Sequence, residues 1–220
     1  MKISNLPISV RLSRKEFVDV AYLQDLFVDS LYAFDKRAVL HGGTAIWRCY
    51  SGNRLSYDLD FYLTSKDEAA LIGKNLTWEL SKRGASLDKM SLIDHSLYAL
   101  VSSQAAKLKA EMKYETKRLR PIVKEYERAD GTLLSVLTLT PEQLILEKIA
   151  AYESRRYIRD LYDIYFLLNY VTKPREVKPK LRNFIKSMEA PVDGKSLSGI
   201  ILAGVAPTYK DLKEGIEAKS

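Results

Sequence analysis

The stretch from His41 to Leu63, HGGTAIWRCYSGNRLSYDLDFYL, constrains this chain more than any other. It ends in an alternating segment whose only charged residues are Asp58 and Asp60. Successive residues of a strand point to opposite faces, so both acids share one face and the apolar residues at 59, 61 and 63 share the other. Two carboxylates about 6–7 Å apart on one face repel each other unless a cation lies between them. The segment therefore predicts a divalent-cation site.

A glycine pair opens the same stretch. Gly42 and Gly43 follow an apolar lead-in and precede Thr44 and a short amphipathic run. Bare backbone N–H groups in a glycine turn ahead of a helix attract an anion. The alternative is a tight strand-to-helix turn that needs glycine only for its backbone angles. Together with the two acids, the turn predicts a site for a metal-bound nucleoside triphosphate.

Four ordered segments carry a family resemblance that covers about residues 38–168. They read GGTA at 42–45, RLSYDLDF at 54–61, KIAA at 148–151 and RDLYD at 159–163. In this order and spacing they resemble the AbiEii/AbiGii-type toxin nucleotidyltransferases, a branch of the polymerase-β-like nucleotidyltransferase superfamily. Two aspartates separated by one residue would be a weak signal alone, whereas four ordered segments are specific.

The resemblance implies an α+β fold. A polymerase-β-like nucleotidyltransferase core, with a mixed or antiparallel sheet flanked by helices, would span residues 1–138. A helical C-terminal region, residues 139–220, would complete the active-site cleft. The implied reaction is Mg²⁺- or Mn²⁺-dependent transfer of a nucleoside monophosphate from an NTP to an acceptor hydroxyl. The resemblance also implies a toxin of a toxin–antitoxin or phage-defence system, with a cognate antitoxin as partner, and some members of the family modify the acceptor end of tRNA.

The same resemblance assigns the nucleotide-binding residues. Gly42, Gly43 and Thr44 would bind the triphosphate through backbone N–H groups and a hydroxyl. Arg54 and Ser56 would contact phosphate just ahead of the acids. For Arg54 an ordinary loop charge explains the residue equally well.

Glu111 is the candidate for a third carboxylate, which polymerase-β-like enzymes carry on a neighbouring strand. In the segment LKAEMKY, residues 108–114, the apolar residues alternate and leave Glu111 on the opposite face. It would ligand a metal or help deprotonate the attacking hydroxyl. Because Lys109 and Lys113 share that face, an ordinary solvated strand explains it nearly as well.

Lys148 interrupts the apolar stripe of its own helix, since it lies four residues after Leu144 and four before Tyr152. A lysine there must snorkel to solvent, pair with an acid or reach an anion. The resemblance implies that Lys148 reaches nucleotide phosphate and that Asp160 orients it or binds substrate. Asp160 and Asp163 also fit common surface pairs at i,i+4 with Arg156 and Arg159.

Composition limits the class of protein. The 220 residues suit one domain, or a core with a smaller appendage. A single cysteine excludes an internal disulfide and suits a reducing cytoplasm, and no apolar run approaches the length of a membrane span. One cysteine and two histidines cannot build a usual zinc site, so carboxylates that bind magnesium or manganese are expected. The net charge of +7 favours an anionic partner such as tRNA, but it also fits an ordinary basic surface.

Periodicity and turn signals predict the elements around these motifs. Helices are expected at 14–34 with Ser13 as N-cap, 42–47, 68–83, 141–154, 157–170, 178–188 and 209–218. Strands are expected at 38–41, 57–63, 86–94, 97–101, 107–115, 122–126 and 133–137. Thr140, Pro141 and Gln143 form a capping-box-like start, Asp130-Gly131 marks a hairpin and Gly84 a helix end.

Three functions compete on the sequence. The first is a nucleotidyltransferase toxin that modifies tRNA, and the second is the same chemistry aimed at a protein hydroxyl. The third is a non-catalytic nucleic-acid-binding module on the same fold. The first two require Asp58 and Asp60 and differ in which macromolecule is labelled. The third predicts salt-sensitive binding that survives loss of both acids.

Overall fold

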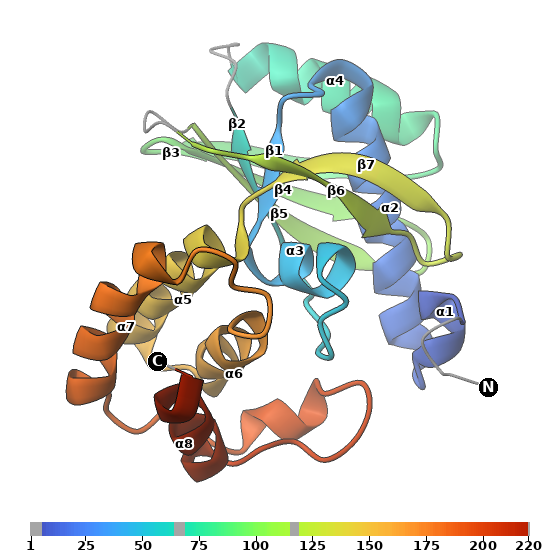
Figure 1. The fold of residues 1–220 in the computed structure, drawn as a ribbon. Helices are drawn as coiled ribbons and strands as arrows, with labels where there is room; N and C mark the ends of the chain where they lie inside the picture. The colour runs from blue at the N-terminus through green and yellow to red at the C-terminus, as the bar shows by residue number, and fades with distance from the viewer. Residues whose placement is uncertain (1–5, 64–68, 115–118, 220) are drawn as a thin grey trace. The chain divides into compact units, whose positions relative to one another are not determined.

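The computed structural model describes residues 6–63, 69–114 and 119–219. The chain forms two compact units (Figure 1). The first comprises Met1–Ser51 and Leu55–Thr138, and the second comprises Gly52–Arg54 and Leu139–Ser220. Among the described residues, no helix combines the length and the apolar character needed to cross a membrane.

The first unit is built on a seven-stranded mixed sheet in the order β3-β4-β5-β2-β1-β7-β6. Neighbouring strands are parallel in the pairs β2–β5 and β1–β7 and antiparallel in the other pairs. This mixed sheet, flanked by helices, confirms the predicted α+β class. The strands are β1 (Val39–His41), β2 (Leu59–Leu63), β3 (Ser86–Ile93), β4 (Ser96–Ser102), β5 (Lys107–Tyr114), β6 (Ile122–Glu127) and β7 (Leu133–Thr138).

Helices cover the sheet of the first unit on both sides. They are α1 (Ile8–Arg11), α2 (Lys15–Phe34), α3 (Gly42–Cys49) and α4 (Ala69–Ser81). α2 packs on α4 and on β5, and α4 packs on β3. The ring of Phe27 on α2 lies 6.1 Å from that of Phe61 on β2, so the apolar face of β2 points into the core under α2. Figure 1 shows α3 on the opposite side of the sheet from α4.

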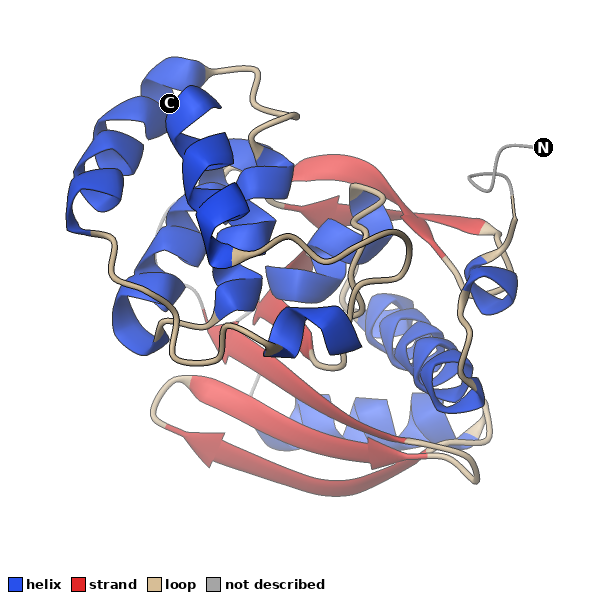
Figure 2. Cartoon of the chain, turned by 90° about the horizontal axis from the view of Figure 1, so that it is seen from below, coloured by secondary structure: helices blue, strands red, loops and turns tan. Residues whose placement is uncertain are grey.

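The second unit consists mainly of helices joined by loops (Figure 2). Thr140 and Gln143 form the predicted capping box at the start of α5, with Pro141 in the first turn. The Tyr152 ring meets that of Phe184 edge-on at 5.6 Å, which packs α5 against α7. The elements are α5 (Pro141–Arg155), α6 (Ile158–Leu167), α7 (Pro174–Ser187), the 3₁₀ turn η2 (Ser196–Gly199) and α8 (Tyr209–Lys219).

Several predicted boundaries differ from the structure. Arg14, not Ser13, occupies the N-cap position of α2, and no side chain caps it. α7 begins at Pro174 rather than at residue 178, because proline is tolerated in the first turn, where its missing N–H has no helical partner. The helical turn α1 lies ahead of residue 14, where the first helix was predicted to begin. Glu68 and Glu115, the predicted first residue of a helix and last residue of a strand, lie outside the described residues.

Candidate active site

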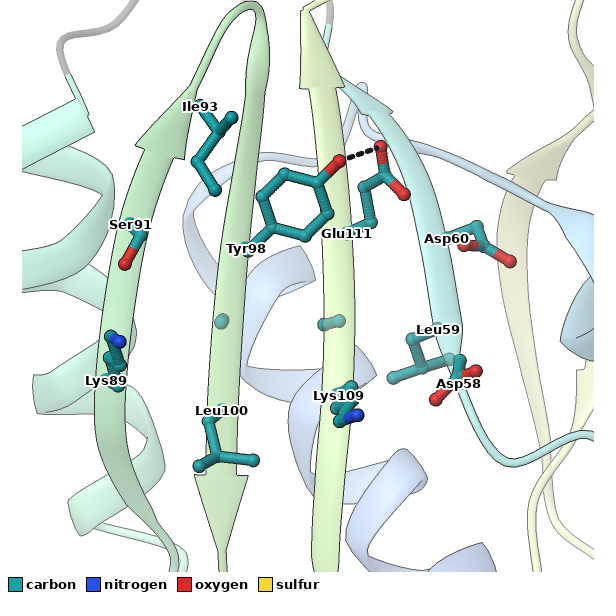
Figure 3. A pocket seen from close by; sticks show the side chains of 12 residues that line it. Asp58, Leu59, Asp60, Lys89, Ser91, Ile93, Tyr98, Leu100, Lys109 and Glu111 are labelled. Atoms are coloured by element: carbon teal, nitrogen blue, oxygen red, sulfur yellow. Dashed lines mark hydrogen bonds between the residues drawn. The ribbon is translucent and has the colours of Figure 1, made fainter.

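Strand β2 presents its acids on the face away from the core. Leu59, Phe61 and Leu63 are at most 1% exposed. Asp60, between them, is half-buried, and Asp58 lies exposed one residue before the strand begins. The structure thus shows the alternation that the sequence predicts, with both carboxylates lining one pocket (Figure 3).

Glu111 is in register with Asp60 on the neighbouring parallel strand β5. The pairing brings the third predicted acid to the same pocket, where the Tyr98 side chain of β4 reaches its carboxylate (Figure 3). One Glu111 oxygen, Oε1, accepts hydrogen bonds from Ser96 Oγ at 2.9 Å and from the Tyr98 hydroxyl at 3.1 Å. Desolvation and the Glu111 carboxylate raise the pKa of Tyr98, so its hydroxyl keeps the proton it donates. Sequence reasoning did not identify Ser96 or Tyr98.

The glycine turn and the acids meet at Gly42. This residue has φ +70°, a conformation that L-residues with a Cβ rarely adopt. A Cβ atom at Gly42 would lie 2.2 Å from Oδ2 and 2.9 Å from Cγ of Asp60. Glycine is therefore required twice here, for its backbone angles and for the space that the Asp60 carboxylate occupies. The start of α3, whose first backbone N–H groups have no partner within the helix, consequently lies beside an acid of β2.

Thr44 braces the loop that carries the acids. Its hydroxyl donates a 2.6 Å hydrogen bond to the backbone carbonyl of Asp58, and the residue is fully buried. The hydroxyl proton expected to bind phosphate is therefore directed at the protein's own backbone. In this structure Thr44 fixes the position of Asp58 relative to α3.

A second brace reaches the same loop from α2, and the sequence motifs did not predict it. Gln24 is fully buried and donates from Nε2 to the carbonyls of Ser56 and Tyr57, at 2.8 and 3.1 Å. Its own Oε1 accepts from the buried guanidinium of Arg48 at 3.2 Å. A glutamine on a helix with an apolar face is the only available signal, because a buried amide must find hydrogen-bond partners.

The second unit holds Lys148 in a buried network of ion pairs. Lys148 Nζ lies 3.2 Å from Asp160 Oδ1 and 2.8 Å from Asp163 Oδ2. Arg155 binds Asp160 with Nε and Nη2, at 2.8 and 2.9 Å. Arg54 binds Asp163 with Nε and Nη2, both at 2.5 Å. Three cations thus surround two fully buried carboxylates.

The network explains the lowered pKa of Asp163 and corrects the partners predicted for both aspartates. Burial alone would raise the pKa of Asp163, but the charges of Arg54 and Lys148 outweigh it and hold that pKa below its ordinary value. The i,i+4 partners considered for the two aspartates are wrong. Asp160 pairs with Arg155, while Arg156 pairs with Glu189. Asp163 pairs with Arg54, which belongs to a segment distant in sequence.

The predicted site residues divide between the two units. The first unit contains Gly42, Gly43, Thr44, Ser56, Asp58, Asp60 and Glu111, and the second contains Arg54, Lys148 and Asp160. Ser56 contributes its backbone carbonyl to the Gln24 brace. Arg54 is only 4% exposed, and its guanidinium donates to Asp163 rather than pointing into solvent as a loop charge would.

The carboxylates of β2 fit a divalent cation. Carboxylate oxygens are the ligands that Mg²⁺ and Mn²⁺ prefer, and Mg²⁺ is usually held by one or two of them together with substrate phosphates. Asp60 lies against the glycine turn, where phosphates would bind. Within the described residues, no three His, Cys, Asp or Glu side chains gather closely enough to hold an ion alone. The arrangement therefore suits a cation whose coordination is completed by the phosphates of a bound NTP.

A mixed sheet flanked by helices, with paired acids on a central strand beside a glycine turn, defines an α+β protein of the nucleotidyltransferase class. Residues 24–198 match the family model described as nucleotidyl transferase AbiEii toxin, type IV toxin–antitoxin system. The chain belongs to this family of nucleotidyltransferase toxins, as the sequence motifs predicted. No curated protein sequence gives a significant match.

Solved structures share the fold. JHP933 from Helicobacter pylori is 21% identical with a TM-score of 0.60, and the match covers 94% of this chain and 89% of that one. MenT4, a nucleotidyltransferase toxin from Mycobacterium tuberculosis, is 16% identical with a TM-score of 0.61, covering 94% and 84%. The antibiotic-resistance factor ANT(2'')-Ia is 12% identical with a TM-score of 0.50, covering 78% and 93%. At these identities the likeness concerns the fold.

Proposed function

We propose that this toxin transfers a nucleoside monophosphate from an NTP to a hydroxyl at the acceptor end of tRNA. It would act in the cytoplasm, where both substrates are found, and a cognate antitoxin would restrain it. The observation that supports the proposal is that Gly42 lies against the Asp60 carboxylate, so a turn suited to phosphate adjoins an acid suited to a divalent cation. The net charge of +7 supports a polynucleotide as the acceptor.

In the proposal, residues of the first unit bind the phosphates and the cation. Backbone N–H groups at Gly42, Gly43 and the start of α3 would bind the β- and γ-phosphates. Asp58 and Asp60 would hold the divalent cation. When bound, the cation neutralises phosphate charge and favours in-line attack at the α-phosphate. The brace from Thr44 keeps Asp58 in place before the substrate arrives, which saves the cost of ordering the loop.

Glu111 and Lys148 have narrower roles in the proposal. Both hydroxyl donors bind Oε1 of Glu111. Its other oxygen, Oε2, would ligand the cation or accept the proton of the attacking hydroxyl. Lys148 would contact nucleotide phosphate. Asp160 and Asp163 would position its ammonium, as their ion pairs do in this structure.

The test incubates the purified protein with total tRNA, a total protein extract, Mg²⁺ and each α-³²P-labelled NTP in turn. The proposal expects label in tRNA with the parent protein and none with Asp58→Ala/Asp60→Ala. Glu153→Ala/Glu214→Ala removes two surface carboxylates of the second unit and is the matched control, which should label tRNA like the parent.

Each alternative outcome identifies another function. Label in protein would replace the tRNA acceptor with a protein hydroxyl. No label with any NTP, together with salt-sensitive RNA binding that survives loss of both acids, would indicate a non-catalytic binding module.

A further inference from the structure

The pocket that contains the acids continues away from them across the sheet. It has a volume of about 410 Å³ and runs from β2 over β5 and β4 to β3 (Figure 3). Asp58 and Asp60 lie at its β2 edge, and Glu111 lines it from β5. The remainder, here called the β3–β5 platform, is lined by Lys89, Ser91, Ile93, Tyr98, Leu100 and Lys109.

A β-bulge aims the β3 residues at this platform. The register between β3 and β4 shifts between Leu87 and Lys89. One extra residue at a bulge changes which side chains reach each face of a sheet. Beyond the bulge, Met90 approaches Gly73 of α4 and faces the helices, so Lys89 and Ser91 face the pocket.

The platform combines positive charge with apolar surface. Lys89 and Lys109 are exposed, and neither forms an ion pair with a carboxylate of the described residues. Leu100 stands between them, in register with both. Tyr98 and Ile93 are 41% and 56% exposed, large values for a ring and a branched aliphatic side chain. Cations beside an open aromatic ring on a sheet are the arrangement that binds the phosphates and bases of single-stranded nucleic acid.

The sheet order fixes the side from which an acceptor reaches the acids. β2 lies between β1 and β5, and the glycine turn at Gly42 follows β1. In phosphoryl transfer the attacking and leaving oxygens are roughly in line, on opposite sides of the phosphorus. If the leaving pyrophosphate is held at the glycine turn, the attacking hydroxyl must approach from the β5 side. That is where the platform begins.

We propose that the β3–β5 platform binds the last nucleotides of a single-stranded RNA 3′ end and presents its terminal hydroxyl to Asp58 and Asp60. This inference rests on the proposed function and adds the acceptor site to it. Lys89 and Lys109 lie two strands apart, about 10 Å at the backbone. A stacked strand rises about 3.4 Å per nucleotide, so this distance spans about three nucleotides. The two lysines bind their phosphates, and Tyr98 stacks on a base.

The test compares two charge-reversal variants that change the net charge equally. Lys89→Glu/Lys109→Glu reverses the platform. Lys36→Glu/Lys74→Glu reverses two exposed lysines of the same unit that do not line the pocket. The probe is a fluorescein-labelled single-stranded RNA of twelve nucleotides with a free 3′ hydroxyl, titrated by anisotropy at several salt concentrations. Binding of a fluorescent NTP with Mg²⁺ is measured in parallel.

The platform variant is expected to lose about tenfold or more in RNA affinity. Its salt slope should fall by about 1.4, because each lost phosphate contact on a single strand accounts for about 0.7. The control variant should lose less than about threefold, and both should bind the NTP like the parent. Equal RNA affinity and salt slope in the two variants would overturn the proposal, as would loss of NTP binding from the platform variant.

The result is separable from failure of the proposed function. If the parent transfers no nucleotide to any acceptor, the proposed function fails whatever the RNA titration shows. If the labelling rate depends on RNA concentration in the same way for the parent and for the platform variant, only the acceptor site is refuted. Label appearing in protein rather than RNA would also refute it.

Discussion

Replacing Gly42 by alanine separates the two reasons for glycine at this turn. Gly42 and Gly84 both lie in the first unit and have similar backbone angles, with φ +70° and +76°. A Cβ atom at Gly84 would meet nothing within 4 Å, whereas at Gly42 it would meet Asp60 Oδ2 at 2.2 Å. Gly84→Ala is therefore the matched control for the backbone cost alone.

The structure sets the size of both effects. An alanine in the left-handed region costs about 1–2 kcal/mol, which is the whole expectation for Gly84→Ala. Gly42→Ala adds a clash that moves the Asp60 carboxylate, and overpacking of this kind costs about 1–3 kcal/mol more. We expect Gly42→Ala to lower the free energy of unfolding by about 2–5 kcal/mol. A shift of about 1 Å in a catalytic group costs about 10²-fold in rate, so transfer should fall by about that factor.

Urea unfolding followed by circular dichroism measures the stability of each variant, and transfer from a labelled NTP at saturating concentration measures the rate. Gly84→Ala should keep a rate within about twofold of the parent, because nothing near residue 84 touches the pocket. If Gly42→Ala is no less stable than Gly84→Ala and retains full transfer, the contact between the glycine turn and Asp60 is not the centre of the site.

Further predictions concern the second unit. Asp163→Ala removes a buried carboxylate that pairs with Arg54 and Lys148, and it should lower the free energy of unfolding in urea by about 3–5 kcal/mol. The control Glu153→Ala removes a surface ion pair and should cost about 0–1 kcal/mol. Equal losses in the two variants would contradict the role of the network. The pKa of Asp163 in the folded state lies below its unfolded value of about 3.9. Its contribution to the free energy of unfolding is therefore present above pH 4 and is lost as pH falls through the folded pKa. Asp163→Asn should flatten this decline of stability at acid pH. Glu142 accepts hydrogen bonds from the backbone N–H groups of Thr172 and Lys173, both at 2.7 Å. Glu142→Ala should lower the free energy of unfolding by about 1–3 kcal/mol and speed hydrogen exchange at those two amides. Unchanged exchange would refute this role.

The local part of the site could be predicted from the sequence because its signals are local. The alternation at Asp58 and Asp60 follows from the two-residue period of a strand, and the capping box at Thr140 from contacts within one helical turn. The glycine pair marked a strand-to-helix turn. Its contact with Asp60 could not be predicted, because it depends on how β1 pairs with β2.

The partners that cross the fold could not be predicted from patterns. Lys148 interrupts an apolar stripe, which left snorkelling, an acid partner and an anion open, and in the structure its ammonium pairs with Asp160 and Asp163. Asp163 was expected to pair with a local arginine, since helix geometry allows an i,i+4 pair. Its actual partner, Arg54, lies 109 positions away. The hydroxyls that hold Glu111 likewise come from β4, through a strand pairing that no local period encodes.

The most direct test of the account is the transfer rate of Asp60→Asn, measured in single-turnover reactions with labelled NTP, Mg²⁺ and tRNA. This substitution keeps the shape of the side chain beside Gly42 and removes only its charge. Asp60→Asn is expected to be as stable as the parent in urea unfolding and to transfer nucleotide at a rate lower by about 10²-fold or more. A stable Asp60→Asn protein that transfers nucleotide at the parental rate would contradict the assignment of this acid, and with it the site built around β2.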